Sequence, residues 1–111
     1  MNAPGDYSAR DLLSRSEVNF DHRSVKSFIE GQSVLVTGAG GSIGSRIVDA
    51  LVKYCPENIV LLGRGEGSIF ESASQIDGRS QPYETVIANV RDKRKINSVF
   101  RAFRPDVVIH T

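Results

Sequence analysis

The feature that most constrains this chain is a glycine-rich turn between an apolar segment and an amphipathic one. Residues 33–37 read as a buried strand, and residues 42–54 carry apolar side chains at helical spacing. The turn between them contains Gly38, Gly41 and Gly44. In such a turn the first glycine permits a tight bend, the second leaves the backbone open to approach, and the third allows close helix packing. This arrangement is typical of the first unit of a doubly wound α/β fold.

The rest of the chain repeats the alternation of strand and helix. Further strands are predicted at 58–62, 84–90 and 106–110, and helices at 67–77 and after Asp92, which is expected to act as an N-cap. Apolar strands separated by amphipathic helices predict a parallel sheet covered on both faces. With right-handed crossovers, this is a partial Rossmann-like doubly wound α/β sheet of about four strands, in the order 3-2-1-4.

Each predicted helix carries an apolar stripe that we expect to face the sheet. The residues of these stripes are Ile43, Ile47, Val48, Leu51 and Val52 in the first helix, Ile69, Phe70, Ala73 and Ile76 in the second, and Ile96, Val99, Phe100 and Phe103 in the third.

Residues 1–32 differ in pattern from the rest and are interpreted as an N-terminal arm. The arm is expected to end in a short helix, capped by Ser24 and stopped at Gly31. Residues 33–111 form the Rossmann half-domain. No helix is predicted after the last strand, so we expect the chain to be the N-terminal part of a longer protein.

Composition excludes several classes of protein. Fourteen Lys and Arg against thirteen Asp and Glu give a net charge of +1, which does not favour a nucleic-acid partner. The longest aliphatic run, Ile59–Leu62, is far below the roughly 18 residues of a membrane span. One cysteine and two histidines provide no metal-site spacing. We therefore expect a cytoplasmic chain without a membrane segment or a metal.

The glycine turn also predicts a ligand. The helix that begins at Ser42 offers free N–H groups and the positive end of its dipole, which suit a pyrophosphate. Strand, turn and helix agree with the unit of about 30 residues that binds dinucleotides. No Gly-Lys-Ser/Thr sequence follows, which excludes a P-loop. A glycine-rich turn without a ligand is the alternative.

The end of the second predicted strand bears on the choice of cofactor. An Asp or Glu about 20 residues after the turn would bond the ribose 2′-hydroxyl of NAD. Here Gly63 and Arg64 occupy this point. Because a guanidinium pairs with a 2′-phosphate, we predict NADP. Glu66 could hold the ribose hydroxyls instead, so NAD is the alternative, and a purely surface role for Arg64 stays open.

The end of the third predicted strand carries Asn89, followed by Val90. The amide of Asn89 can bond the adenine amino group, and Val90 can form a wall beside the ring. The alternative is that Asn89 only shapes the turn between strand and helix.

Several of these segments together resemble a known family. They resemble the extended short-chain dehydrogenases/reductases and, more narrowly, the CapD-type branch of polysaccharide biosynthesis, which comprises nucleotide-sugar 4,6-dehydratases and epimerases. The segments are residues 11–15, 34–45, 61–71, 90–92 and 104–110. Two departures stand out, because Gly63 and Asn89 replace acidic residues that are usual in the family.

The resemblance implies a set of cofactor contacts. Thr111 is included, at a place where the family usually has Ala. The implied residues are Thr37, Gly38, Gly41, Ser42, Ile43, Gly44, Arg64, Glu66, Ser68, Asn89, Val90 and Thr111.

The resemblance implies no catalytic residue in this chain. The superfamily uses a Tyr with a Lys four residues later, and Tyr7, Tyr54 and Tyr83 are all followed at that spacing by other residues. No nucleophile–base pair is visible around Cys55 or His110, which are interpreted as structural.

The implied parent is an NADP-dependent lyase that acts on a UDP-N-acetylhexosamine in bacterial surface polysaccharide biosynthesis. The UDP-sugar would bind only to the full-length parent, which we expect to form a homo-oligomer. Anchoring of that parent to the inner membrane is left open. The alternatives are part of a UDP-sugar 4-epimerase or reductase, or a non-catalytic dinucleotide-binding module.

Overall fold

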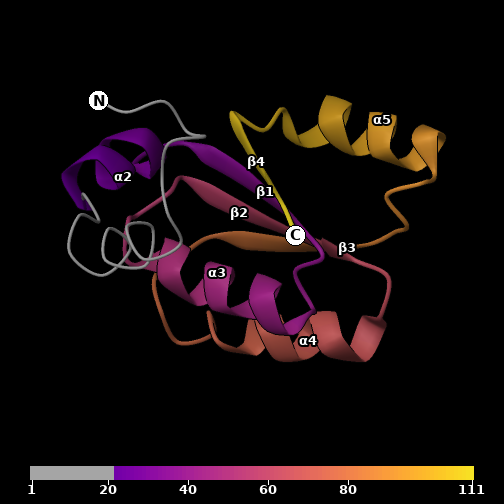
Figure 1. Cartoon of the computed structure of the whole chain (residues 1–111), viewed down its shortest axis with the longest axis horizontal. Coiled ribbons are helices and arrows are strands. Elements are labelled where there is room, and N and C mark those ends of the chain that lie inside the picture. The colour runs from indigo at the N-terminus through magenta and orange to yellow at the C-terminus, as the bar shows by residue number, and fades with distance from the viewer. Residues whose placement is uncertain (1–21) are drawn as a thin grey trace, which may run out of the picture.

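The computed structural model describes residues 22–111, whose strands form one parallel sheet (Figure 1). The sheet has the order β3-β2-β1-β4, which confirms the predicted order. The elements are α2 (His22–Ile29), β1 (Ser33–Thr37), α3 (Ser42–Val52), β2 (Asn58–Gly63), α4 (Glu66–Ser74), β3 (Tyr83–Ile87), α5 (Lys93–Phe103) and β4 (Val107–His110).

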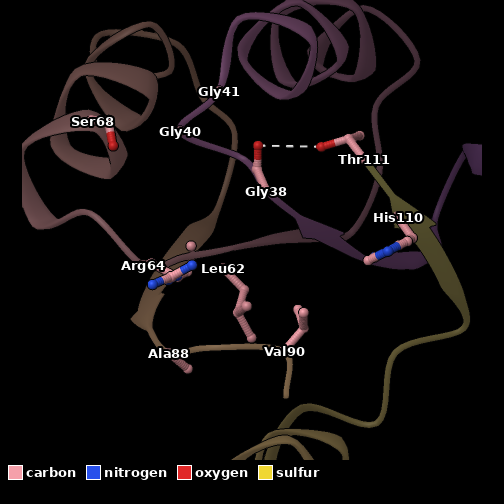
Figure 2. Close-up of a pocket in the computed structure, with 11 residues that line it drawn as sticks. Gly38, Gly40, Gly41, Leu62, Arg64, Ser68, Ala88, Val90, His110 and Thr111 are labelled. Atoms are coloured by element: carbon pink, nitrogen blue, oxygen red, sulfur yellow. Dashed lines mark hydrogen bonds between the residues drawn. The ribbon is translucent and has the colours of Figure 1, made fainter. Parts of the chain in front are cut away.

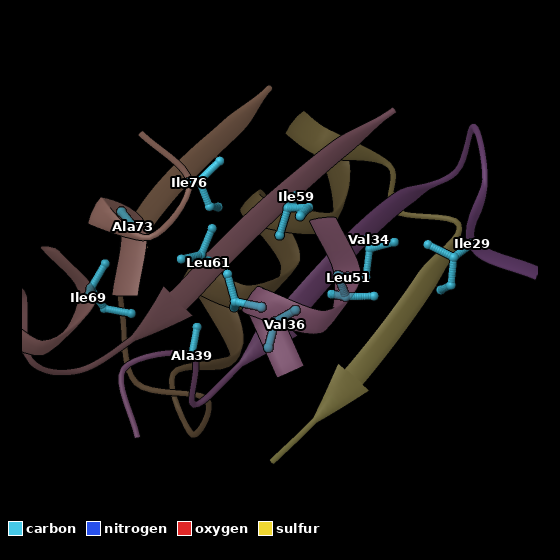
Figure 3. Close-up of a cluster of buried hydrophobic side chains, with 11 residues drawn as sticks. Ile29, Val34, Val36, Ala39, Leu51, Ile59, Leu61, Ile69, Ala73 and Ile76 are labelled. Atoms are coloured by element: carbon cyan, nitrogen blue, oxygen red, sulfur yellow. The ribbon is translucent and has the colours of Figure 1, made fainter. Parts of the chain in front are cut away.

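Both faces of the sheet are covered by helices. Alternate side chains of a strand point to opposite faces, so Val34 and Val36 pack on one side of β1 and Leu35 on the other. The larger cluster joins the sheet to α2, α3 and α4, and Figure 3 shows its side chains between these layers. The smaller cluster joins the opposite face to α5 through Val99. The prediction of a doubly covered parallel sheet is confirmed.

The register brings the carboxyl ends of the strands together at one edge. Thr37 lies between Leu62 of β2 and His110 of β4, and Gly63 is paired with Ile87 of β3. The loops that leave this edge are therefore neighbours in space although they are far apart in the sequence. This edge is where doubly wound folds bind their ligands.

Three residues of the predicted apolar stripes do not face the core. Ile43, Phe70 and Phe100 are 68%, 73% and 40% exposed. Phe70 and Phe100 directly follow the buried Ile69 and Val99. A helical residue is rotated by about 100° from its neighbour, and Phe70 and Phe100 are turned away from the core that Ile69 and Val99 enter. The predicted stripes were too wide at these positions.

Several predicted boundaries also need correction. α2 begins at His22, so Ser24 lies inside the helix and is not its cap. β3 ends at Ile87, which places Asn89 and Val90 after the strand rather than within it. The predicted cap is confirmed at Asp92, whose Oδ1 accepts a hydrogen bond of 3.2 Å from the Lys95 N–H. The part of the predicted arm before residue 22 lies outside the described residues.

Candidate functional site

A pocket of about 310 Å³ opens at the carboxyl edge of the sheet. Figure 2 shows the side chains that surround it, which come from the β1–α3 turn, the start of α4, the end of β4 and the segments after β2 and β3. Its lining residues are Gly38, Gly40, Gly41, Leu62, Gly63, Arg64, Ser68, Ala88, Val90, His110 and Thr111.

Two glycines of the turn are required by the fold. Gly38 has φ +64°, which L side chains rarely adopt, and a Cβ there would lie 2.6 Å from Thr111 Oγ1. A Cβ on Gly44 would lie 2.8 Å from the carbonyl carbon of Gly38 and 2.9 Å from Ala39 Cα. The tight turn at Gly38 and the close packing at Gly44 are thus confirmed, although Gly44 packs against the turn itself.

Gly41 is different, because the fold does not need a glycine there. It is exposed, its φ of −76° and ψ of 172° suit any residue, and a Cβ would be 3.4 Å from its nearest neighbour, Gly38 O. The absent side chain leaves space in the pocket wall at the start of α3. A ligand that approaches the backbone would account for this glycine.

The amino end of α3 has free hydrogen-bonding capacity. The first N–H groups of a helix have no acceptor within the helix, and Ser42, Ile43 and Gly44 supply them here. Gly41 offers no capping side chain, and the first turn contains no acidic residue. These N–H groups and the helix dipole favour an anion beside Gly41.

The charge among the residues that line the pocket is positive, like the amino end of the α3 dipole. Arg64 is exposed and contributes a guanidinium, and the described residues that line the pocket include no carboxylate. Glu66 begins α4 but does not line the pocket. Ser68 does line it, and its Oγ donates 3.1 Å to the carbonyl of Gly65. The β2 side of the pocket therefore favours a negatively charged group.

The segment after β3 gives the pocket an apolar wall. Ala88 and Val90 line it together with Leu62, which comes from the end of β2. Asn89 lies outside the lining, and its Oδ1 accepts 2.9 Å from the Arg91 N–H, as in an Asx turn. The structure thus gives Asn89 the turn-shaping contact that was the alternative to adenine binding.

Side-chain hydrogen bonds tie the end of β1 to the end of β4. Thr37 Oγ1 lies 2.6 Å from His110 Nδ1, and Thr111 Oγ1 donates 2.8 Å to Thr37 O and 3.2 Å to Gly38 O. The last of these bonds is the dashed line in Figure 2. Thr37 itself is buried, at 6% exposure, and does not line the pocket. This end of the pocket is therefore held by hydroxyl and imidazole groups.

The structure gathers half of the predicted contact residues around the pocket. Those that line it are Gly38, Gly41, Arg64, Ser68, Val90 and Thr111, whereas Thr37, Ser42, Ile43, Gly44, Glu66 and Asn89 do not. The sequence reasoning missed five further lining residues, namely Gly40, Leu62, Gly63, Ala88 and His110. Leu62, Gly63 and His110 had a positional signal, because each lies at or just after the carboxyl end of a predicted strand. Ala88 follows a strand only in the structure, where β3 ends at Ile87.

Cys55, which the sequence analysis interpreted as structural, is exposed and has φ +53°. Within residues 22–111, no three His, Cys, Asp or Glu side chains are grouped in a way that could hold a metal ion. None of the helices described is long and apolar enough to cross a bilayer.

Comparison with solved structures supports the fold. The chain is similar to NAD⁺-bound xylitol dehydrogenase, with a TM-score of 0.63 and 24% identity over 72% of this chain and 32% of that one. It is also similar to the epimerase Mth375 of Methanothermobacter thermautotrophicus, with a TM-score of 0.58 and 26% identity over 78% of this chain and 24% of that one. Both likenesses extend over most of the described residues.

Comparison with curated proteins gives relatives with higher identity. The chain is 41% identical over 108 residues to the polysaccharide biosynthesis protein EpsC of Bacillus subtilis, covering 95% of this chain and 18% of EpsC. It is 40% identical over 103 residues to the capsular polysaccharide biosynthesis protein CapD of Staphylococcus aureus, covering 90% and 17%. The chain thus spans less than a fifth of the length of either relative.

A third relative is the inverting UDP-N-acetylglucosamine 4,6-dehydratase of Campylobacter jejuni, with 33% identity over 72% of this chain and 23% of that protein. Residues 34–111 match the family model described as polysaccharide biosynthesis protein. This match covers the sheet from Val34 onward, the glycine turn and the whole pocket, and it agrees with the resemblance noted in the sequence. The chain belongs to the polysaccharide biosynthesis protein family.

Proposed function

We propose that this chain is the dinucleotide-binding portion of a nucleotide-sugar 4,6-dehydratase. The observation that carries the proposal is Gly41, which has an ordinary backbone conformation, room for a Cβ, and a position at the amino end of α3 in the pocket wall. The backbone conformation and the space at Gly41 do not require a glycine, whereas a pyrophosphate close to the backbone does.

The remaining pocket fits the other parts of a dinucleotide. The N–H groups of Ser42, Ile43 and Gly44 do not line the pocket but follow Gly41, which does, and they would hold the pyrophosphate. Arg64 and Ser68 would contact the adenosine ribose, and Glu66 at the start of α4 is close in sequence to both. The apolar wall of Leu62, Ala88 and Val90 suits the faces of an adenine ring. The nicotinamide half would then lie toward β4.

Arg64 favours NADP over NAD. It directly follows the buried Gly63, which occupies the point where NAD enzymes of this fold carry an acid. A Cβ on Gly63 would lie 2.7 Å from Ile69 Cδ1, so a carboxylate at that position would need Ile69 to move. The residues that line the pocket therefore offer a cation for a 2′-phosphate and no carboxylate for a 2′-hydroxyl, and Glu66 is the nearby acid outside this lining.

The reaction is proposed from the family and its named relatives. When bound, a nicotinamide dinucleotide supplies a reversible hydride acceptor, which 4,6-dehydration of a sugar requires. A UDP-N-acetylhexosamine substrate is supported by the name of the Campylobacter jejuni relative. We assign proton transfer and sugar binding to parts of a longer, cytoplasmic and homo-oligomeric parent that acts as a lyase.

A second candidate is the cofactor portion of a nucleotide-sugar 4-epimerase. Its support is the likeness to the epimerase Mth375, at 26% identity. Both reactions need the same hydride acceptor, so the pocket described above serves either candidate.

Calorimetric titration of the 111-residue chain with NADP⁺, NAD⁺ and UDP-N-acetylglucosamine tests the proposal. We expect both dinucleotides to bind, NADP⁺ more tightly, and the UDP-sugar to show no binding. With cofactor and UDP-sugar present together, mass spectrometry should detect no dehydrated product. Absence of dinucleotide binding would overturn the cofactor assignment, and turnover by this chain alone would overturn the assignment of catalysis to other parts of a parent.

A further inference from the structure

Thr37 and His110 are partners in the register of β1 and β4, and their side chains are hydrogen-bonded at 2.6 Å between Oγ1 and Nδ1. Thr37 is buried, whereas His110 is exposed and lines the pocket. Figure 2 shows the imidazole extending from β4 toward the middle of the pocket residues. The pair thus joins a buried hydroxyl to a ring that a ligand could reach.

The direction of this hydrogen bond follows from the burial of Thr37. Among residues 22–111, His110 Nδ1 is the one partner of Thr37 Oγ1. A buried hydroxyl hydrogen without an acceptor is unfavourable, so Thr37 donates to Nδ1. An Nδ1 that accepts carries no hydrogen, and the neutral imidazole then has its hydrogen on Nε2. The ring therefore presents Nε2–H as a donor.

We infer that His110 donates a hydrogen bond from Nε2–H to the bound dinucleotide, and that Thr37 is the positioning residue that fixes the ring in this tautomer. The inference rests on the proposed function and extends it to the β4 side of the pocket. Arg64 and the apolar wall come from the β2 and β3 side, and β1 separates them from β4. His110 should therefore contact oxygen atoms of the ligand beyond its adenosine half.

The tautomer can be measured without any ligand. Long-range ¹H–¹⁵N NMR of the 111-residue chain distinguishes Nδ1–H from Nε2–H in each histidine. We expect His110 to be the Nε2–H tautomer in the wild type and in Thr37→Ser, and a mixture of both tautomers in Thr37→Val. An Nδ1–H tautomer in the wild type, or an unchanged spectrum in Thr37→Val, would overturn the positioning role of Thr37.

Measurements of dissociation constants test the proposed hydrogen bond from His110 to the dinucleotide. The two probes are NADP⁺ and its adenosine half, 2′,5′-ADP. Loss of one hydrogen bond in His110→Phe should weaken NADP⁺ by about three- to tenfold and leave 2′,5′-ADP unchanged. Thr37→Val should weaken NADP⁺ in the same direction, and Thr37→Ser should restore it. Circular dichroism checks the folding of every variant. If Thr37→Val does not fold, His110→Phe still tests the contact, because the His110 side chain is exposed.

The outcomes separate this inference from the proposed function. If the wild type binds NADP⁺ and His110→Phe binds it equally well, the contact is wrong and the cofactor site stands. If His110→Phe weakens NADP⁺ and 2′,5′-ADP alike, the contact is not specific to the β4 side and the inference fails. If the wild type binds no dinucleotide, the proposed function fails and the ligand contact fails with it, while the NMR result still decides the role of Thr37.

Discussion

Gly44 in the first turn of α3 lies so close to Gly38 that a Cβ on Gly44 would be 2.8 Å from the Gly38 carbonyl carbon. The two Gly38 atoms that such a Cβ would meet most closely belong to the backbone. The turn at Gly38 is also held by a hydrogen bond of 3.0 Å, which the Gly41 N–H donates to Gly38 O. The helix start and the glycine turn are therefore one packed unit, and the pocket takes its shape from it.

Gly44→Ala should destabilise the fold. The new methyl group overlaps backbone that cannot rotate away, and overpacking of this kind costs about 1–3 kcal/mol. Gly67→Ala is the matched control, because a Cβ at Gly67 in α4 meets nothing within 4 Å. Urea denaturation of both variants should show a lower midpoint for Gly44→Ala and an equal or higher one for Gly67→Ala. Equal midpoints for the two variants would contradict the close packing.

Gly41→Val should abolish dinucleotide binding and leave the fold intact. The backbone at Gly41 suits valine and the Cβ has ordinary contacts, so unfolding is not expected. The side chain would occupy the space proposed for the pyrophosphate. Calorimetric titration with NADP⁺, on a variant whose circular dichroism matches the wild type, measures this effect. Unchanged affinity would show that no phosphate group approaches the backbone there.

Ser72→Ala should destabilise the glycine turn from its other side. Ser72 is buried, and its Oγ donates 2.7 Å to the carbonyl of Ala39 in the turn. Its loss leaves a buried carbonyl without this partner, at a cost of about 1–3 kcal/mol. The control is Ser74→Ala, because Ser74 is exposed and its Oγ donates to Glu71 O within its own helix. Thermal unfolding should separate the two variants, and a Ser72→Ala variant as stable as Ser74→Ala would contradict the role given to this bond.

The strand order could be predicted from the sequence because the continuous apolar runs of β1 and β2 indicate parallel strands buried on both faces, and right-handed crossovers leave few possible orders for such strands. The sequence also predicted Gly38 and Gly44, because the positive φ of Gly38 and the contact of Gly44 with the turn are local geometry. It failed for Gly40, where a Cβ would lie 2.7 Å from Ser68 Oγ. That restriction comes from α4, 28 residues later in the chain, and no local pattern encodes it.

The same reason explains what was missed at the end of β4. His110 was interpreted as structural because no partner was visible near it in the sequence. Its partner is Thr37, 73 residues away, and only the parallel register of β1 and β4 brings the two together. Long-range pairings of this kind decide which strand-end residues face the pocket. Composition and periodicity do not report them.

NADP⁺ should bind more tightly than NAD⁺, by about 1.5–3 kcal/mol, the contribution of a hydrogen bond to a charged group. Arg64→Ala should remove most of this difference by weakening NADP⁺ alone, because NAD⁺ lacks the 2′-phosphate. Glu66→Gln is the matched variant, and it should leave NADP⁺ binding equal or stronger, since it removes a carboxylate near the proposed phosphate site.

Salt provides an independent check on the role of Arg64. Because Arg64 is exposed, its attraction to a phosphate should be screened over about 8–10 Å at physiological ionic strength and more strongly above it. The preference of the wild type for NADP⁺ should therefore shrink between 0.05 and 0.5 M NaCl, roughly the range over which screening lengths fall severalfold. In Arg64→Ala, the difference in affinity between NADP⁺ and NAD⁺ should not depend on salt. Dissociation constants for both dinucleotides, in both proteins and at both salt concentrations, decide the matter. Equal affinity of the wild type for NAD⁺ and NADP⁺ at low salt would mean that Arg64 is only a surface residue and that the cofactor is not selected here.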